Sequence, residues 1–106
     1  MQQITANQLK AWLDDPARDK PVLIDVREPW EFDICRIAGS KLIPMRTIPA
    51  RMEEIERDVD TVMICHHGAR SFQVGMFLEQ QGYAKLINLH GGMAAWAQID
   101  PATATY

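Results

Sequence analysis

Short apolar runs that alternate with longer amphipathic stretches limit how this chain can fold. Residues 22–26, 61–64 and 85–89 are mostly apolar, and residues 41–43 form a weaker run of the same kind. Runs of this length without polar alternation are typical of strands buried on both faces, as in parallel sheets. The pattern predicts an α/β fold with a mostly parallel central sheet of about four to five strands, flanked by helices on both faces.

The amphipathic stretches predict these helices. The first begins after Thr5, which is placed to form a capping box with Gln8, and ends before Pro16. Apolar residues at helical spacing predict three more helices: residues 47–57, a segment from about Arg70 to Gly82, and a last helix that begins at residues 93–97 and is closed by Pro101.

Composition narrows the class of protein. The chain has 106 residues, of which 47% are hydrophobic, and a net charge of -3. This length predicts one domain over residues 1–106, with enough core to fold without disulfides or metals. The charge balance argues against nucleic-acid binding, and no apolar run is long enough to span a membrane. The N-terminal residues lack the pattern of a signal peptide and the chain has only two cysteines, so we expect a cytoplasmic protein.

The segment after residues 61–64 carries the candidate chemistry. Cys65 follows the strand directly, and a short loop then leads into a helix: His66, His67, Gly68, Ala69, Arg70 and Ser71. Ligands of α/β sheets bind beyond the carboxyl ends of the strands, and a loop that curls into a helix directs backbone N–H groups at its centre. Gly68 can adopt the positive φ that such a curl often requires. These N–H groups and the Arg70 charge favour the reactive thiolate of Cys65.

The length of this loop selects among reactions. Four residues separate Cys65 from Arg70, and cysteine-dependent phosphatases have one residue more. The shorter ring fits a single sulfur atom better than a phosphoryl group, which points to a persulfide on Cys65 stabilised by backbone N–H groups. The alternative is that Cys65 is a buried apolar residue at the end of a strand, which leaves Gly68 and Arg70 unexplained.

Three segments together resemble the rhodanese superfamily of sulfurtransferases, over almost the whole chain. Residues 23–32 resemble its first signature, in which Asp25 and Arg27 form Asp-x-Arg ahead of a Glu-Phe pair. Residues 65–70 resemble its active-site loop, and residues 89–96 resemble its C-terminal signature. The order and spacing of the three segments make this resemblance specific.

The resemblance implies a sulfurtransferase that uses a Cys65 persulfide and no other cofactor. It implies a thiosulfate-like or persulfide donor, and an acceptor such as cyanide, a thiol or a thioredoxin-like protein. It also places Asp25 and Arg27 beside the loop, where Asp25 accepts hydrogen bonds from loop N–H groups and Arg27 attracts an anionic donor. The alternative for these two residues is a structural ion pair that ties two loops together.

The histidines and the second cysteine have further interpretations. At least one of His66 and His67 is expected to face solvent, and either can carry positive charge that favours an anionic donor. With Cys65, Cys35 and His90 they suggest zinc, but contiguous Cys-His-His lacks the spacing of structural zinc sites, so no metal is expected. Cys35 is expected to be structural, with a resolving thiol for Cys65 as the alternative.

Two functions from other classes use the same features. A phosphatase or arsenate reductase would use the Cys65–Arg70 cradle, which the short loop argues against, and hydrolysis of an aryl phosphate would identify it. A non-enzymatic module would bind a partner and never acquire sulfur on Cys65. Ser71, in the first turn of the helix, is expected to cap the helix or stabilise the loop rather than to act as a nucleophile.

Overall fold

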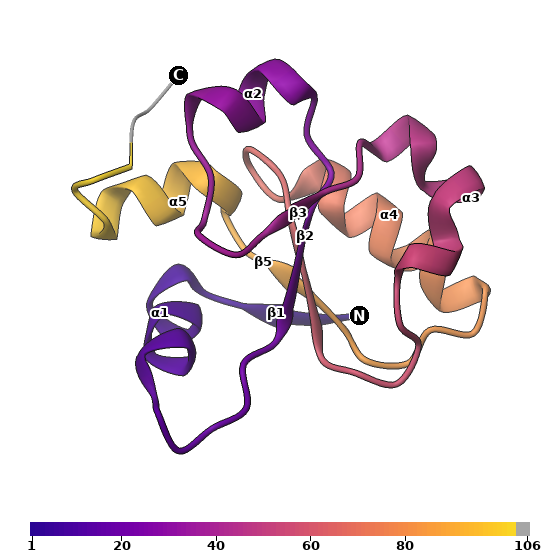
Figure 1. Ribbon diagram of the computed structural model, residues 1–106, viewed down its shortest axis with the longest axis horizontal. Coiled ribbons are helices and arrows are strands. Elements are labelled where there is room, and N and C mark those ends of the chain that lie inside the picture. Colours follow the sequence, from indigo (N-terminus) through magenta and orange to yellow (C-terminus); the bar gives the residue numbers. More distant parts are fainter. Residues whose placement is uncertain (104–106) are drawn as a thin grey trace.

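The computed structural model describes residues 1–103 and confirms the α/β fold. Its strands form one parallel sheet of five members in the order β1-β5-β4-β2-β3 (Figure 1). At the carboxyl end of the sheet, the Val26 N–H donates to the Ile64 carbonyl at 2.9 Å, which ties the end of β2 to the end of β4. The strands are β1 (Gln2–Ile4), β2 (Val22–Asp25), β3 (Lys41–Leu42), β4 (Thr61–Ile64) and β5 (Leu86–Leu89).

Helices cover both faces of the sheet, as expected. Helices α1 and α5 lie on one side of the strands, and α3 and α4 lie on the other (Figure 1). Across the described residues, every helix is too short or too polar to cross a lipid bilayer. The helices are α1 (Ala6–Asp14), α2 (Pro29–Ile34), α3 (Ile48–Arg51), α4 (Ala69–Gln80) and α5 (Gly92–Ile99).

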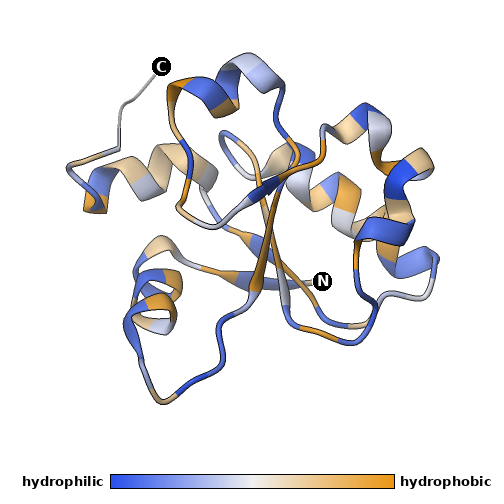
Figure 2. Cartoon of the chain, in the orientation of Figure 1, coloured by the Kyte–Doolittle hydropathy of each residue, from blue (hydrophilic) through white to orange (hydrophobic). Residues whose placement is uncertain are grey.

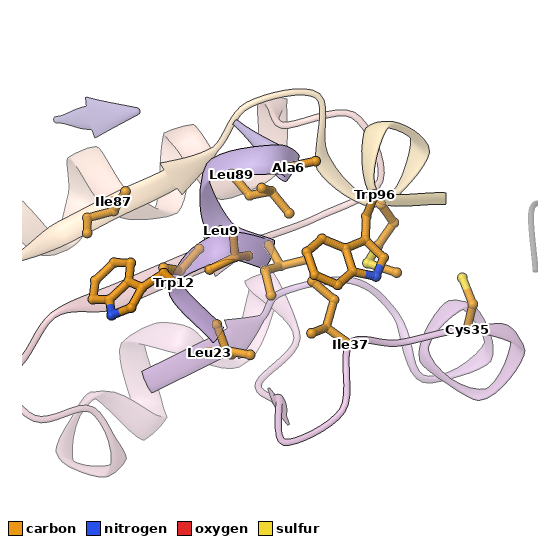
Figure 3. Close-up of a cluster of buried hydrophobic side chains, with 12 residues drawn as sticks. Ala6, Leu9, Trp12, Leu23, Cys35, Ile37, Ile87, Leu89 and Trp96 are labelled. Atoms are coloured by element: carbon orange, nitrogen blue, oxygen red, sulfur yellow. The ribbon is translucent and has the colours of Figure 1, made fainter. Parts of the chain in front are cut away.

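Two hydrophobic clusters fill the space between the sheet and its helices. Successive strand residues alternate between them, so that Leu23 and Val62 belong to the cluster under α1 and α5, whereas Ile24 and Met63 belong to the cluster under α3 and α4. Figure 3 shows the first cluster, in which Trp12 and Trp96 are the largest side chains. Hydrophobic colours are concentrated in the central strands and polar colours in the outer loops (Figure 2). The sheet is therefore buried on both faces.

The predicted start of the first helix is confirmed. The Gln8 N–H donates to Thr5 Oγ1 at 3.1 Å, and the Thr5 N–H donates to Gln8 Oε1 at 2.9 Å, which completes the capping box. This exchange satisfies a backbone donor that the first turn leaves unpaired.

The prediction of one helix over residues 47–57 is wrong. The segment divides into the 3-10 turn η1 (Met45–Thr47), the short helix α3 and a second 3-10 turn, η2 (Met52–Glu54). Pro49 provides no backbone N–H, and the Ile55 N–H donates to the Met52 carbonyl three residues earlier, at 3.0 Å. Ile48 and Ile55 are nevertheless buried, so the apolar pattern identified the inward-facing residues of a segment that is not a continuous helix.

Candidate functional site

Cys65 lies at the floor of the predicted loop, directly after β4. The residue is 1% exposed, and its Sγ accepts a hydrogen bond from the Gly68 N–H at 3.0 Å. Gly68 has a φ of 100°, so the expected positive φ is confirmed. This conformation turns the loop back over the sulfur and leads into α4, which begins at Ala69, one residue earlier than expected.

The N-terminus of α5 fixes the first part of the loop. The Met93 N–H donates to the Cys65 carbonyl at 2.8 Å, and the Ala94 N–H donates to the His66 carbonyl at 3.0 Å. Gly92 has a φ of 56°, and a Cβ at this position would lie 2.3 Å from the Cys65 carbonyl oxygen. Only glycine allows this approach, which is why the C-terminal signature matters to the Cys65 loop.

A buried polar network lies behind the sulfur. Ser71 Oγ lies 3.3 Å from Cys65 Sγ and 2.5 Å from Oδ1 of Asn88, a buried residue of β5. Nδ2 of Asn88 donates to the Gly68 carbonyl at 3.1 Å and to Gln3 Oε1 at 3.0 Å. The expected loop-stabilising position of Ser71 is thus what the structure shows. Sequence reasoning missed Asn88, although a polar residue inside an apolar strand was the available signal.

The C-terminal end of the loop is held by a buried carboxylate. Arg70 Nη1 and Nη2 donate to the two oxygens of Glu31 at 2.7 and 2.9 Å, and Glu31 Oε1 also accepts from the Glu28 N–H. The Glu31 side chain is 5% exposed and the Arg70 side chain 36%. Glu31 is the second residue in contact with the loop that sequence reasoning missed. Its position in the Glu-Phe pair of the first signature was the signal.

Asp25 and Arg27 form an ion pair that is shielded from solvent. Both are 0% exposed, and Arg27 Nη2 lies 2.7 Å from Asp25 Oδ2. Arg27 also donates to the Cys35 carbonyl at 2.6 Å, which links the end of β2 to the segment after α2. The structure thus contains the ion pair of the structural alternative. The expectation that Arg27 attracts an anionic donor from solvent is wrong because the guanidinium is buried. The hydrogen bonds that the described residues donate to the Asp25 carboxylate come from Arg27 and not from the Cys65 loop.

The two loop histidines occupy different environments. His67 is exposed, as expected of at least one of them, and its ring meets the His66 ring edge to face with centroids 4.0 Å apart. Burial, and then the charge of His67, hold the pKa of His66 below its usual 6.5. This shift lowers the fraction of His66 that carries a positive charge near neutral pH, which argues against His66 as the source of charge for an anionic donor.

Two cavities flank the loop. One of about 350 Å³ is lined by His67, Gly68 and Asn88 among others. The other, of about 470 Å³, lies on the side of α3 and is lined by Val26, Glu28, Met45, Arg46, Pro49 and Arg70. The Arg46 side chain is 71% exposed. This second cavity therefore has the solvent-accessible cation that the sequence analysis assigned to Arg27.

The positions of the two cysteines and of the histidines bear on the metal hypothesis and on the role of Cys35. Within residues 1–103, no three His, Cys, Asp or Glu side chains lie close enough together to hold a metal ion. Cys35 belongs to the cluster under α1 and α5, at one end beyond Ile37 and Trp96 (Figure 3), whereas Cys65 belongs to the cluster on the other face. Both cysteines are free thiols. A redox role for Cys35 stays an untested hypothesis.

Comparison with known proteins identifies the family. A family model for rhodanese, described as a rhodanese-like domain, matches residues 5–99. The chain belongs to the rhodanese family. A sulfurtransferase of Allochromatium vinosum is 46% identical to this rhodanese over 77 residues, which cover 73% of this chain and 72% of that protein. A rhodanese-like domain protein of Staphylococcus aureus has a crystal structure that superimposes with a TM-score of 0.87 at 32% identity, covering 100% of this chain and 99% of the other.

Two more relatives show the range of sizes in which this rhodanese domain occurs. The thiosulfate sulfurtransferase GlpE of Tolumonas auensis is 29% identical, over 97% of this chain and 94% of that protein. A rhodanese-like/PpiC domain-containing chloroplastic protein of Arabidopsis thaliana is 34% identical over 100% of this chain, which spans 38% of that longer protein. The same domain thus occurs both as a short protein and as part of a larger one.

Proposed function

We propose that this rhodanese is a sulfurtransferase that carries sulfane sulfur as a persulfide on Cys65. The observation that carries the proposal is the Cys65 sulfur itself, which accepts the Gly68 N–H at 3.0 Å in a loop of four residues between cysteine and arginine. A cradle of this size suits one additional sulfur atom. A thiolate in it gains a hydrogen bond that favours its charged form.

The reaction is a double displacement. The Cys65 thiolate attacks the outer sulfur of thiosulfate, the sulfur–sulfur bond of the donor breaks, and sulfite leaves with the bonding electron pair. An acceptor nucleophile, cyanide or a thiolate, then attacks the outer sulfur of the Cys65 persulfide and restores the Cys65 thiolate. A persulfide donor enters by the same first step and releases a thiolate. The cycle requires no cofactor, because the sulfur is carried on the protein.

Charge near the loop supports an anionic donor. Arg46 lines the cavity beside Arg70 and is exposed, with Glu28 Oε1 3.6 Å from its Nη1. A solvent-facing guanidinium raises the local concentration of small anions. The name of the GlpE relative, a thiosulfate sulfurtransferase, agrees with this choice of donor. A thiol of a partner protein, including a thioredoxin-like protein, is the proposed cellular acceptor, and the cytoplasm the proposed location.

Intact-protein mass spectrometry tests the proposal. The wild-type protein is incubated with thiosulfate and measured before and after cyanide, beside Cys65→Ser and Cys35→Ser. We expect wild type and Cys35→Ser to gain one sulfur atom that cyanide removes, and Cys65→Ser to gain none. Absence of any gain in reduced wild-type protein would contradict the proposal, and hydrolysis of an aryl phosphate that Cys65→Ser abolishes would identify a phosphatase instead.

A further inference from the structure

A buried hydroxyl and a buried amide lie behind the Cys65 sulfur, and the double displacement above uses neither. Ser71 is 0% exposed and Asn88 is 3% exposed. The Ser71 oxygen lies 2.5 Å from Asn88 Oδ1 and 3.3 Å from the Cys65 sulfur. A serine hydroxyl has one proton to donate, so it donates either to the amide oxygen or to the sulfur.

The orientation of the Asn88 amide decides where this proton lies in the resting protein. Its Nδ2 donates to the Gly68 carbonyl at 3.1 Å. A backbone carbonyl can only accept, so Nδ2 must face Gly68, and Oδ1 must face Ser71. The Ser71 proton therefore lies on the bond to Asn88 while Cys65 is a neutral thiol, and the Ser71 oxygen presents a lone pair to the S–H group.

Ionisation of Cys65 changes the sulfur from a hydrogen-bond donor into an acceptor only. A thiolate accepts hydrogen bonds, and Gly68 already provides one at 3.0 Å. The Ser71 oxygen is close enough to provide another by rotation about its Cβ–Oγ bond, without movement of the backbone. Ser71 keeps its proton throughout. The bond to Asn88 breaks, a bond to the sulfur forms, and the thiol proton leaves to solvent.

We propose that Asn88 is a positioning residue that competes with the Cys65 sulfur for the Ser71 proton. Asn88 holds the hydroxyl while the thiol is neutral, and Ser71 turns to the sulfur when Cys65 becomes a thiolate. Asn88 thereby restrains ionisation of Cys65, and Ser71 promotes it. The inference rests on the proposed function, in which the thiolate is the reacting species.

The pH dependence of Cys65 alkylation by iodoacetamide tests this competition, measured by mass spectrometry on the Cys65-containing peptide. Asn88→Leu removes the acceptor that competes with the sulfur for the Ser71 proton, so we expect alkylation about fivefold faster at low pH, as the strength of a single hydrogen bond implies. The pH–rate profile moves to lower pH. Ser71→Ala loses the donor, so its profile moves to higher pH by a similar amount. Asn88→Ser, which is smaller and remains polar, replaces Asn88→Leu if that variant does not fold by circular dichroism.

The double variant separates competition from loosening of the loop, because Asn88→Leu also removes the bond to the Gly68 carbonyl. We expect Ser71→Ala/Asn88→Leu to react like Ser71→Ala. Faster alkylation on adding Asn88→Leu to Ser71→Ala, or an unchanged profile in the single Asn88 variant, would overturn the proposal. Alkylation uses no sulfur donor, so it fails or succeeds separately from the thiosulfate experiment that tests the proposed function.

Discussion

The guanidinium of Arg70 is joined to the carboxylate of Glu31 by two hydrogen bonds, of 2.7 and 2.9 Å, across 39 positions of sequence. The contact attaches the end of the Cys65 loop to α2, which precedes it by two strands. A paired geometry of this kind fixes the plane of the guanidinium as well as its position. Arg70 therefore acts on the loop first as an anchor, with its charge offset by a carboxylate.

Glu31→Gln is expected to destabilise the domain and to impair sulfur transfer together. The substitution keeps the size of the side chain but leaves the Arg70 charge without its counter-ion. Because Arg70 is partly exposed, we expect a loss of about 1–3 kcal/mol in the free energy of unfolding by urea, less than for a fully buried pair. Glu54→Gln, which removes the surface ion pairs of Glu54 with Lys41 and Arg51, is the matched control. Equal urea midpoints for the two variants would contradict the anchoring role of Glu31.

Gly92→Ala is expected to be more damaging than another substitution at a glycine of positive φ. Its Cβ would lie 2.3 Å from the Cys65 carbonyl oxygen, whereas a Cβ at Gly39, with a φ of +85°, would meet nothing within 4 Å. Gly39→Ala therefore measures the conformational cost alone, about 1–2 kcal/mol. We expect about 3 kcal/mol or more for Gly92→Ala in urea unfolding, because displacement of the loop adds to that cost. A similar loss in both variants would show that the close approach does not matter.

The parts of the fold that the sequence predicts are those in which the local pattern and burial agree. Strands β4 and β5 are buried throughout and are apolar apart from Thr61 and Asn88, and the capping box of α1 depends on two residues three positions apart. Helix α2 breaks this agreement: Trp30 is 59% exposed and Ile34 44%, whereas Glu31 is buried. Its inward face is selected by a partner distant in the sequence, Arg70, so no periodicity within residues 29–34 could identify it.

The pH dependence of stability is expected to show a contribution from His66. Burial and the neighbouring His67 lower the pKa of His66 in the folded protein, so the unfolded chain binds a proton at higher pH than the folded one does. The free energy of unfolding therefore falls as the pH drops below about 6.5, the ordinary value for histidine. In urea titrations between pH 7 and pH 5, we expect His66→Asn to lose less stability than wild type. An equal loss would exclude this contribution from His66.

Arg46→Ala is expected to weaken the interaction with an anionic donor. Because the side chain is 71% exposed, we expect an increase in KM for thiosulfate of about two- to fivefold, with kcat little changed. Rising ionic strength should reduce the difference, since salt screens exposed charges. Lys85→Ala removes the same charge at the other end of the sheet, just before β5, and is the control. Equal KM values in the two variants would argue against a local role of Arg46.

In the candidate site, as in the fold, the sequence predicted the features that depend on neighbouring residues and missed the contacts between residues distant in sequence. The central loop of the site, with a positive φ at Gly68, follows from residues that are contiguous in the chain. Asn88 and Glu31 act through residues far from them in sequence, so only the folded chain shows their contacts. The prediction for Arg27 failed for a related reason. A charged side chain at the end of a strand is expected to be exposed to solvent, but Arg27 is buried together with its partner Asp25.

The hydrogen bonds from Met93 and Ala94 to the carbonyls of Cys65 and His66 make the shape of the Cys65 loop dependent on α5. Under the proposed function, the loop is thus held in shape by α5 independently of a sulfur donor, which lowers the cost of ordering it on binding. Because of these bonds, the Met93 and Ala94 amides are expected to exchange with deuterated solvent only when α5 separates from the loop, so their exchange rates measure that separation. We therefore expect separation of α5 from the loop to change the reactivity of the Cys65 thiol as well.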